Sequence, residues 1–390
     1  MKITRLETVR LGRHPDLLWL RVHTDEGLTG LGETSYAPRA VSALIHDDLA
    51  PILLGESPLD IERLWNGMFA AVNAYGFGGA ETRAISAVDI ALWDILGQYT
   101  GQPIYNLLGG RNRDRIPIYN TCLSPGTCRD AERWMEGRGG QLAAELLGEG
   151  IRAMKIWPFD LPLLGEADGG AVGPVRHFID PDRLQRGLAC VEEIRAVVGG
   201  SVAIAIEGNA RWNLPAATAI ARALEPYEIM WLEEMIPPDN VESYARLKAA
   251  SRIPICVSER LFTRFGFRRV VEANAADIII PDCSWTGGIS ETRKICALAD
   301  SYYLPVTCHD ATGPVALWAA AHLMLHIPNA MILETVRAYY DGWYNEVVTE
   351  RIPISDGMLS LPQRPGLGVA LREEVLGWPD ARVEDGTNAG

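Results

Sequence analysis

Seven ionisable side chains recur along the chain, each inside or just after a short apolar run. From the third run onward they follow one another at intervals of 23 to 27 residues. In chain order they are Lys155, Glu207, Glu233, Glu259, Asp282, His309 and Glu334. In folds that alternate parallel strands with helices, the carboxyl ends of the strands share one rim, where active sites are built. We therefore expect these side chains to meet at one rim.

Three consecutive runs end at or just before a glutamate, namely Glu207, Glu233 and Glu259. Three carboxylates side by side would repel each other and raise each other's pKa. A divalent cation relieves this repulsion, and all-oxygen ligation suits Mg²⁺ or Mn²⁺. The alternative is that each glutamate pairs with a Lys or Arg of the neighbouring strand. Because the three are in register, the pattern favours a metal site.

Asp282 and His309 follow two adjacent runs. A carboxylate beside an imidazole fixes its tautomer and raises its basicity, as a general base requires. The alternative for His309 is a structural histidine that a backbone carbonyl satisfies. The adjacent carboxylate favours the acid–base interpretation.

Lys155 is the cation of this set. It could hold a substrate carboxylate or assist enolate formation, or it could be the counter-charge of Glu207 or Glu233. Glu334, at the last run, could stay protonated among the other acids and donate a hydrogen bond. Its alternative is a salt bridge with Arg337 or Lys155.

Eight apolar runs rich in Ile and Val alternate with helical patterns from Arg115 onward. The runs are 116–121, 152–157, 202–207, 229–233, 253–258, 277–281, 304–308 and 330–334. The helical patterns are 131–149, 183–198, 215–224, 241–250, 264–274, 289–301 and 314–326. Eight such units are typical of a TIM barrel, and runs without alternation suit parallel strands covered on both faces. No clear helix follows the eighth run, and a Pro- and Gly-rich insertion at 158–181 is long enough to be functional.

The first part of the chain has a different pattern. Residues 3–11 and 17–24 are strand-like, with a turn at 12–15, and a short strand follows at 29–33. Helical patterns cover 38–53, 60–74 and 82–99. We predict an α/β protein with an N-terminal α+β domain over 1–112, a barrel over 113–355, and a C-terminal segment over 356–390 that returns to the first domain.

Composition excludes several classes of partner. The formal net charge of −14 over 390 residues argues against nucleic-acid and anionic-membrane partners. The seven cysteines form no C-x-x-C pair, which predicts reduced thiols in a cytoplasmic protein. The first residues lack the apolar run of a signal peptide, and no stretch has the roughly 18 uncharged apolar residues of a membrane helix.

Several motifs together resemble the mandelate racemase subgroup of the enolase superfamily. They are SAVDIALWD at 86–94, LLGG at 107–110, WLEE at 231–234, SER at 258–260, Pro281-Asp282, Gly287-Gly288 and His309. The resemblance covers essentially the whole chain. It implies a capping domain over a (β/α)₇β barrel, a bound Mg²⁺, a homo-oligomer, and a base that removes the proton α to a carboxylate.

Departures from the family pattern narrow the range of reactions that the resemblance allows. Racemases of the subgroup carry Lys-x-Lys on the second strand, where this chain has Lys155-Ile156-Trp157. The second base is missing, which argues against racemisation, whereas one base is enough for a β-elimination. Residues 258–281 most resemble sugar-acid dehydratases similar to galactonate dehydratase. Those enzymes carry Asp-x-His on the third strand, and here Asn209 replaces the His; it can bind a hydroxyl but cannot protonate it.

The resemblance therefore implies dehydration of a mono- or diacid sugar to a 2-keto-3-deoxy acid. We expect His309 to act alone, taking the α-proton and returning it to the departing hydroxyl on the same face. Within the 12–15 turn, which overhangs the site in related proteins, His14 is a second candidate acid and Arg13 a substrate contact, although a histidine in a turn is usually only solvated. Trp157 and Trp285 could stack on the substrate or simply pack. The alternative functions are a racemase or epimerase, and a metal-binding member without turnover.

Overall fold

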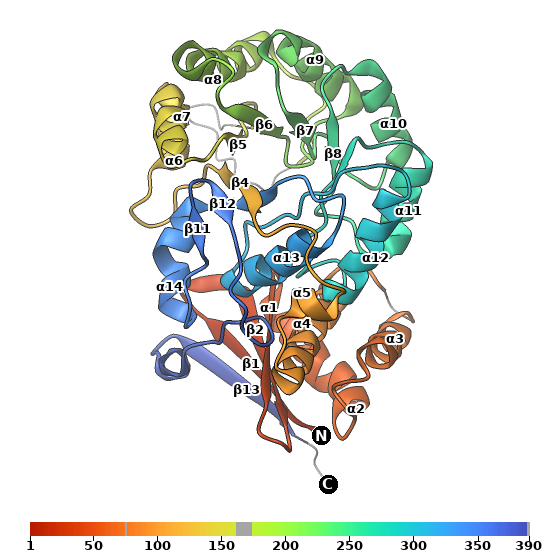
Figure 1. Ribbon diagram of the computed structural model, residues 1–390. Coiled ribbons are helices and arrows are strands. Elements are labelled where there is room, and N and C mark those ends of the chain that lie inside the picture. The colour runs from red at the N-terminus through yellow and green to blue at the C-terminus, as the bar shows by residue number, and fades with distance from the viewer. Residues whose placement is uncertain (75, 161–173, 388–390) are drawn as a thin grey trace.

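The computed structural model describes residues 1–74, 76–160 and 174–387. Figure 1 shows two parts: an N-terminal α+β part, red to orange, and a larger α/β part whose helices surround a barrel-type sheet. None of the helices in the described residues combines the length and the apolar character needed to cross a membrane.

The N-terminal sheet has four strands in the order β13-β1-β2-β3. Strands β1 (Ile3–Leu11), β2 (His14–Thr24) and β3 (Thr29–Ser35) are antiparallel. Leu11 pairs with His14, so the turn is shorter than the sequence predicts and His14 begins β2. Strand β13 (Ala381–Thr387) pairs antiparallel with β1 and brings the end of the chain back to its beginning (Figure 1).

Helices cover one face of this sheet. They are α1 (Pro38–Ala43), η1 (Leu44–Leu49), α2 (Ala50–Leu53), α3 (Ile61–Val72) and α4 (Ala80–Thr100). Helix α4 lies directly on β3, where glycine is required: a Cβ at Gly32 would lie 1.9 Å from the backbone oxygen of Ala87. This close approach fixes α4 against the sheet.

The larger part contains the predicted parallel strands. They are β4 (Ile116–Thr121), β5 (Ala153–Ile156), β6 (Ala203–Glu207), β7 (Trp231–Glu233), β8 (Ile255–Val257), β9 (Ile278–Ile279) and β10 (Leu333–Thr335). Strands β4 to β9 pair in chain order, and β10 pairs with β4. The short strands β11 (Ile354–Ser355) and β12 (Met358–Leu359) extend the sheet beyond β4.

Helices lie between these strands and before and after them in the chain. They are α5 (Ile104–Leu107), α6 (Asp130–Met135), α7 (Gly139–Gly148), α8 (Pro181–Val198), α9 (Leu214–Leu224), η2 (Glu225–Tyr227), α10 (Val241–Ala250), α11 (Thr263–Glu272), α12 (Gly288–Asp300), α13 (Pro314–His326), η3 (Tyr339–Trp343), α14 (Tyr344–Val347) and η4 (Glu373–Gly377). The helix predicted at 131–149 is two helices, because Gly137 between them adopts φ of +74°.

The seventh predicted strand, 304–308, differs from expectation. It makes only isolated bridges, in which Val306 pairs with Ile279 on one side and Ala330 on the other. Pro305 has no N–H to donate to a continuous ladder. The segment still runs between β9 and the chain leading into β10, so it carries His309 to the same rim as the other strand ends.

Two buried carboxylates of the N-terminal part dock it on the strand ends. Asp89 of α4 accepts a hydrogen bond of 2.9 Å from the N–H of Ser290 at the start of α12. Gly288 adopts φ of +83°, and a Cβ there would lie 2.3 Å from the Asp89 carboxylate. Glu33 of β3 likewise accepts the N–H of Ala316 in the first turn of α13, at 3.0 Å. The SAVDIALWD motif therefore includes a residue that joins the two parts.

Candidate active site

The seven side chains predicted from the strand ends come together in the structure. Each of them is less than a tenth exposed. Glu207 and Glu233 are direct register partners across β6 and β7. Burying this many ionisable groups is costly unless they pair with each other or with a ligand.

Lys155 lies at the centre of the acidic side chains. Its Nζ contacts Glu233, lies 2.8 Å from Glu334 Oε1, and lies 3.4 Å from Glu207 Oε2. Burial alone would lower the pKa of Lys155, but the three carboxylates raise it well above its ordinary value. The ammonium group is therefore charged and acts as their shared counter-charge.

Glu334 is ionised, which corrects the expectation of a protonated donor. Burial would raise the pKa of Glu334, but Lys155 and His309 outweigh it and lower that pKa to about 2. Its carboxylate also accepts hydrogen bonds from Thr121 Oγ1 and from the N–H of Asp310. Of the two partners that the sequence offered, it pairs with Lys155; Arg337 instead binds Asp130, with 2.6 Å between Nη2 and Oδ1.

The three predicted metal ligands are close neighbours, but their carboxylates are not arranged in a coordination geometry. Among the described residues, no three His, Cys, Asp or Glu side chains are arranged to hold a metal ion. Lys155 contacts Glu207 and Glu233, while Glu259 Oε1 lies 3.2 Å from Arg260 Nε. All three glutamates thus form salt bridges, but only that between Lys155 and Glu207 joins neighbouring strands, as the alternative required.

The donor chemistry nevertheless fits a hard divalent cation. Glu259 Oε2 is buried without a hydrogen-bond partner in the described part of the chain. Burial raises the pKa of Glu207 and of Glu233, and Lys155 only partly offsets it. A cation among these oxygens would offset the same cost, and carboxylate oxygens are the ligands that Mg²⁺ prefers.

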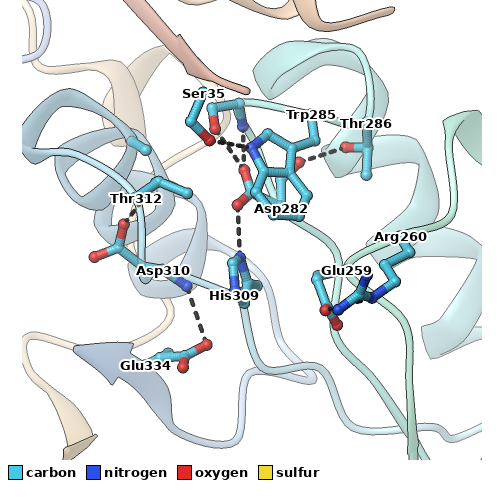
Figure 2. A network of polar contacts seen from close by, with 12 residues as sticks. Ser35, Glu259, Arg260, Asp282, Trp285, Thr286, His309, Asp310, Thr312 and Glu334 are labelled. Atoms are coloured by element: carbon cyan, nitrogen blue, oxygen red, sulfur yellow. Dashed lines mark hydrogen bonds and ion pairs between the residues drawn. The ribbon is translucent and has the colours of Figure 1, made fainter. Parts of the chain in front are cut away.

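His309 and Asp282 form the predicted pair. Figure 2 shows His309 pointing at Asp282, with 2.7 Å between Nδ1 and Oδ2. The other Asp282 oxygen accepts the N–H and the hydroxyl of Ser284, both at 2.7 Å. An ionised carboxylate only accepts hydrogen bonds, so Nδ1 carries a proton and Nε2 is left for chemistry.

The charge around His309 favours its protonated form. Burial alone would lower the pKa of His309, but the charge of Glu334 and the hydrogen bond to Asp282 raise it to about 10. A divalent cation beside Glu259 would act in the opposite direction, because a nearby positive charge disfavours an imidazolium. Binding of a metal ion and protonation of His309 would therefore be coupled.

Two residues of the N-terminal part that sequence reasoning missed, Ser35 and Arg83, lie against the predicted candidate Trp285. The Trp285 ring lies 4.9 Å from the His309 ring, and its Nε1 donates to Ser35 Oγ at 2.8 Å (Figure 2). The guanidinium of Arg83 lies 4.1 Å from the centre of the Trp285 ring. The ring of Tyr36 also contacts Trp285, with 5.4 Å between the ring centres. Arg83 lies on α4, away from any strand end, so the strand-end rule could not find it.

Asn209 has a partner that was also missed. Its Nδ2 donates to Asp160 Oδ2 at 2.9 Å, and its N–H donates to Glu207 Oε1 at 2.7 Å. Asp160 is buried, and this burial raises the pKa of its carboxyl to about 7. Asp160 lies at the start of the predicted insertion; residues 161–173 of that insertion lie outside the described part of the chain.

Trp157 packs on a neighbouring tryptophan, and its stacking on a substrate stays a prediction. It is half-buried and packs edge to face on Trp134, with 5.2 Å between the rings. The packing alternative therefore describes its contacts.

Arg13 and His14 line a cavity of about 930 Å³ between the two parts, together with Tyr36, Thr312 and Tyr339. Arg13 is engaged with Asp380, at 2.9 Å, and His14 stacks on Trp343, at 4.0 Å. Burial and the charge of Arg13 lower the pKa of His14 to about 4. His14 is therefore neutral at neutral pH and lacks the proton that the predicted acid role needs.

Comparisons with known proteins agree with this architecture. Residues 9–109 match the family described as mandelate racemase / muconate lactonizing enzyme, N-terminal domain, and residues 140–375 match the enolase C-terminal domain-like family. A D-galactonate dehydratase of Ralstonia nicotianae is 35% identical over 96% of this chain and 94% of its own length. A D-xylonate dehydratase of Haloferax volcanii is 33% identical over 95% and 87%.

Solved structures resemble the whole chain. An enolase of the mandelate racemase subgroup from Agrobacterium tumefaciens has a TM-score of 0.89 and 41% identity, covering 100% of this chain and 99% of the other. A putative dehydratase from Zymomonas mobilis has a TM-score of 0.90 and 29% identity, covering 98% and 99%.

Proposed function

Because this chain belongs to the mandelate racemase and muconate lactonizing enzyme family of the enolase superfamily and is a lyase of the dehydratase type, we propose that it dehydrates an acid sugar with Mg²⁺. The product is a 2-keto-3-deoxy acid. The observation that carries the proposal is the His309–Asp282 pair beside the buried glutamates and Lys155. A general base next to a cluster suited to a metal is what abstraction of an α-proton requires.

Glu207, Glu233 and Glu259 would hold the metal. When bound, it supplies Lewis-acid stabilisation of the negative charge that develops on the substrate carboxylate, worth several kcal/mol. Lys155 adds a fixed positive charge beside that carboxylate. Since Lys155 contacts two of the three ligands in the present arrangement, we expect it to release part of that contact when the metal binds.

His309 performs the proton transfer. Its Nε2 takes the proton from the carbon α to the carboxylate, and Asp282 stabilises the imidazolium that forms. The C–O bond at the β-carbon then breaks, the hydroxyl leaves as water with the proton from His309, and the enol becomes the 2-keto acid by tautomerisation. Asn209, whose amide donates to Asp160, would bind a substrate hydroxyl.

Elimination is favoured over racemisation. Two-base racemisation needs a base on each face of the carbon, and the second-base position holds Trp157, which packs on Trp134. Assembly into a homo-oligomer and a cytoplasmic location stay predictions from the sequence.

A substrate screen tests the proposal. The purified protein is incubated with Mg²⁺ and a panel of acid sugars that includes D-galactonate and D-xylonate, and 2-keto-3-deoxy products are detected with semicarbazide. We expect a product that disappears with a chelator and returns with Mg²⁺. Inversion of the α-carbon without loss of water would instead identify an epimerase.

A further inference from the structure

Arg83 differs from the other cations around the site. Lys155 contacts three glutamates, and Arg260 lies 3.2 Å from Glu259. In the described residues, no Asp or Glu forms a salt bridge with Arg83; its Nη1 donates to the backbone oxygen of Ser35 at 2.8 Å. An arginine that is largely enclosed is normally paired with a carboxylate or a bound anion.

The surroundings of Arg83 are aromatic. Its guanidinium lies 4.1 Å from the centre of the Trp285 ring and 5.4 Å from that of Tyr36. Burial lowers the pKa of Arg83 to about 10, and the nearby charges of Asp282 and Glu259 offset this only in part, so the group stays charged at neutral pH. Stacking on the rings stabilises the cation and holds the planar guanidinium in a fixed orientation. This arrangement is suited to an anion that comes from outside the protein.

Arg83 and the predicted base His309 both lie against the ring of Trp285. The ring of Trp285 contacts both Arg83 and His309, at 4.1 Å and 4.9 Å. Trp285 follows β9, whereas Lys155 lies on β5, four positions away in the strand order. Arg83 and Lys155 therefore lie on different sides of the group of strand ends, and the Trp285 ring lies against both Arg83 and His309.

We propose that the substrate of this enzyme is a diacid sugar whose second carboxylate binds Arg83, an inference that rests on the proposed dehydration. The reacting carboxylate lies beside Lys155 and the glutamates, the α-carbon faces His309, and the far carboxylate neutralises Arg83. A planar guanidinium matches a carboxylate with two parallel hydrogen bonds. A monoacid sugar, which ends in a neutral hydroxymethyl group, offers Arg83 no carboxylate to bind.

Binding of unreactive acids tests the site without turnover. Adipate has the length of a six-carbon diacid sugar but no hydroxyl to eliminate, and hexanoate lacks its second carboxylate. Calorimetry is done on the Mg²⁺-loaded protein and on R83Q, with R63Q as the control because Arg63 is an exposed arginine paired with Glu56. We expect adipate to bind the natural protein and R63Q about 10- to 100-fold more tightly than hexanoate, the range of a charge-assisted hydrogen bond. R83Q should lose this preference, and R83K should keep part of it.

Absent or equal binding of adipate, or an adipate preference that survives in R83Q, would overturn the assignment. Turnover separates the two proposals: kcat/KM for galactarate should exceed that for D-galactonate, and R83Q should lower the first about 10- to 100-fold more than the second. If neither acid is dehydrated while adipate still binds through Arg83, the dehydration proposal fails and the diacid site stands. If D-galactonate is dehydrated equally well by R83Q and galactarate is not preferred, the diacid site fails and dehydration stands.

Discussion

His309 Nδ1 lies 2.7 Å from Asp282 Oδ2, and the two residues follow neighbouring segments of the barrel-type sheet. The other oxygen of Asp282 is held by Ser284. The carboxylate therefore has one free direction, and it uses that direction to orient the imidazole. This contact joins the fold to the proposed chemistry.

Replacing Asp282 with Asn should lower kcat strongly while the protein stays folded. An amide can offer an N–H to Nδ1, which would move the imidazole proton to Nε2 and remove the base. In a related carboxylate–histidine pair such a change costs about 10⁴-fold, and we expect a loss of about 10²- to 10⁴-fold here. The measurement is kcat on the acid sugar found by the screen, with D60N, at an exposed ion pair, as the control. An unchanged kcat in D282N would contradict the proposed role.

The stability of the metal-free protein should depend on the protonation of His309. Its folded pKa is raised from 6.5 to about 10. A raised pKa gives stability that is fully present below the unfolded value and is lost as pH rises through the folded value. The free energy of unfolding should therefore fall between about pH 6.5 and pH 10, and less so in H309Q. Urea unfolding in the presence of a chelator measures this; equal pH slopes for both proteins would exclude it.

Removing the charge of Lys155 should destabilise the metal-free protein and strengthen its response to metal. The substitution K155M leaves Glu207, Glu233 and Glu334 buried without their shared cation. Breaking a buried ion pair costs about 3–5 kcal/mol, and added Mg²⁺ should recover part of it. The control is R186M, whose partner Asp182 is exposed and which should cost about 0–1 kcal/mol. Denaturant unfolding with and without Mg²⁺ is the measurement. A K155M protein that is as stable as R186M and indifferent to Mg²⁺ would contradict the metal assignment.

Asp160 should give the stability of the protein a second pH dependence, in a lower pH range than that of His309. Burial raises the pKa of its carboxyl from 3.8 to about 7. Stability from this group is therefore present at low pH and declines as pH rises from about 4 through 7. In D160N that decline should be smaller, whereas D182N, at an exposed position, should behave like the natural protein. Thermal unfolding across this range is the measurement, and identical profiles for D160N and D182N would refute the expectation.

The sequence predicts the strand ends well because parallel strands leave a local pattern. Each apolar run that stops at Glu207, Glu233 or Glu334 is a strand in the structure, and the common direction of the strands brings their ends together. The run at 304–308 shows the limit: its apolar pattern is that of a strand, but Pro305 leaves only isolated bridges.

The remaining features depend on contacts between distant segments. Arg83 reaches the site from α4, and Asp160 reaches Asn209 across 49 positions of sequence. The charge of Glu334 depends on Lys155 and His309 together, which no spacing reveals. His14 resembled a turn residue, yet it begins β2 and stacks on Trp343.

The most direct test of the account follows the α-proton itself. The natural protein and H309N are incubated with Mg²⁺ in D₂O with galactarate and D-galactonate, and NMR follows both the dehydrated product and deuterium at the α-carbon. We predict that the natural protein forms product and that H309N forms no product and exchanges no α-proton. Exchange by H309N at the rate of the natural protein would show that another group removes the proton, and would contradict the central claim.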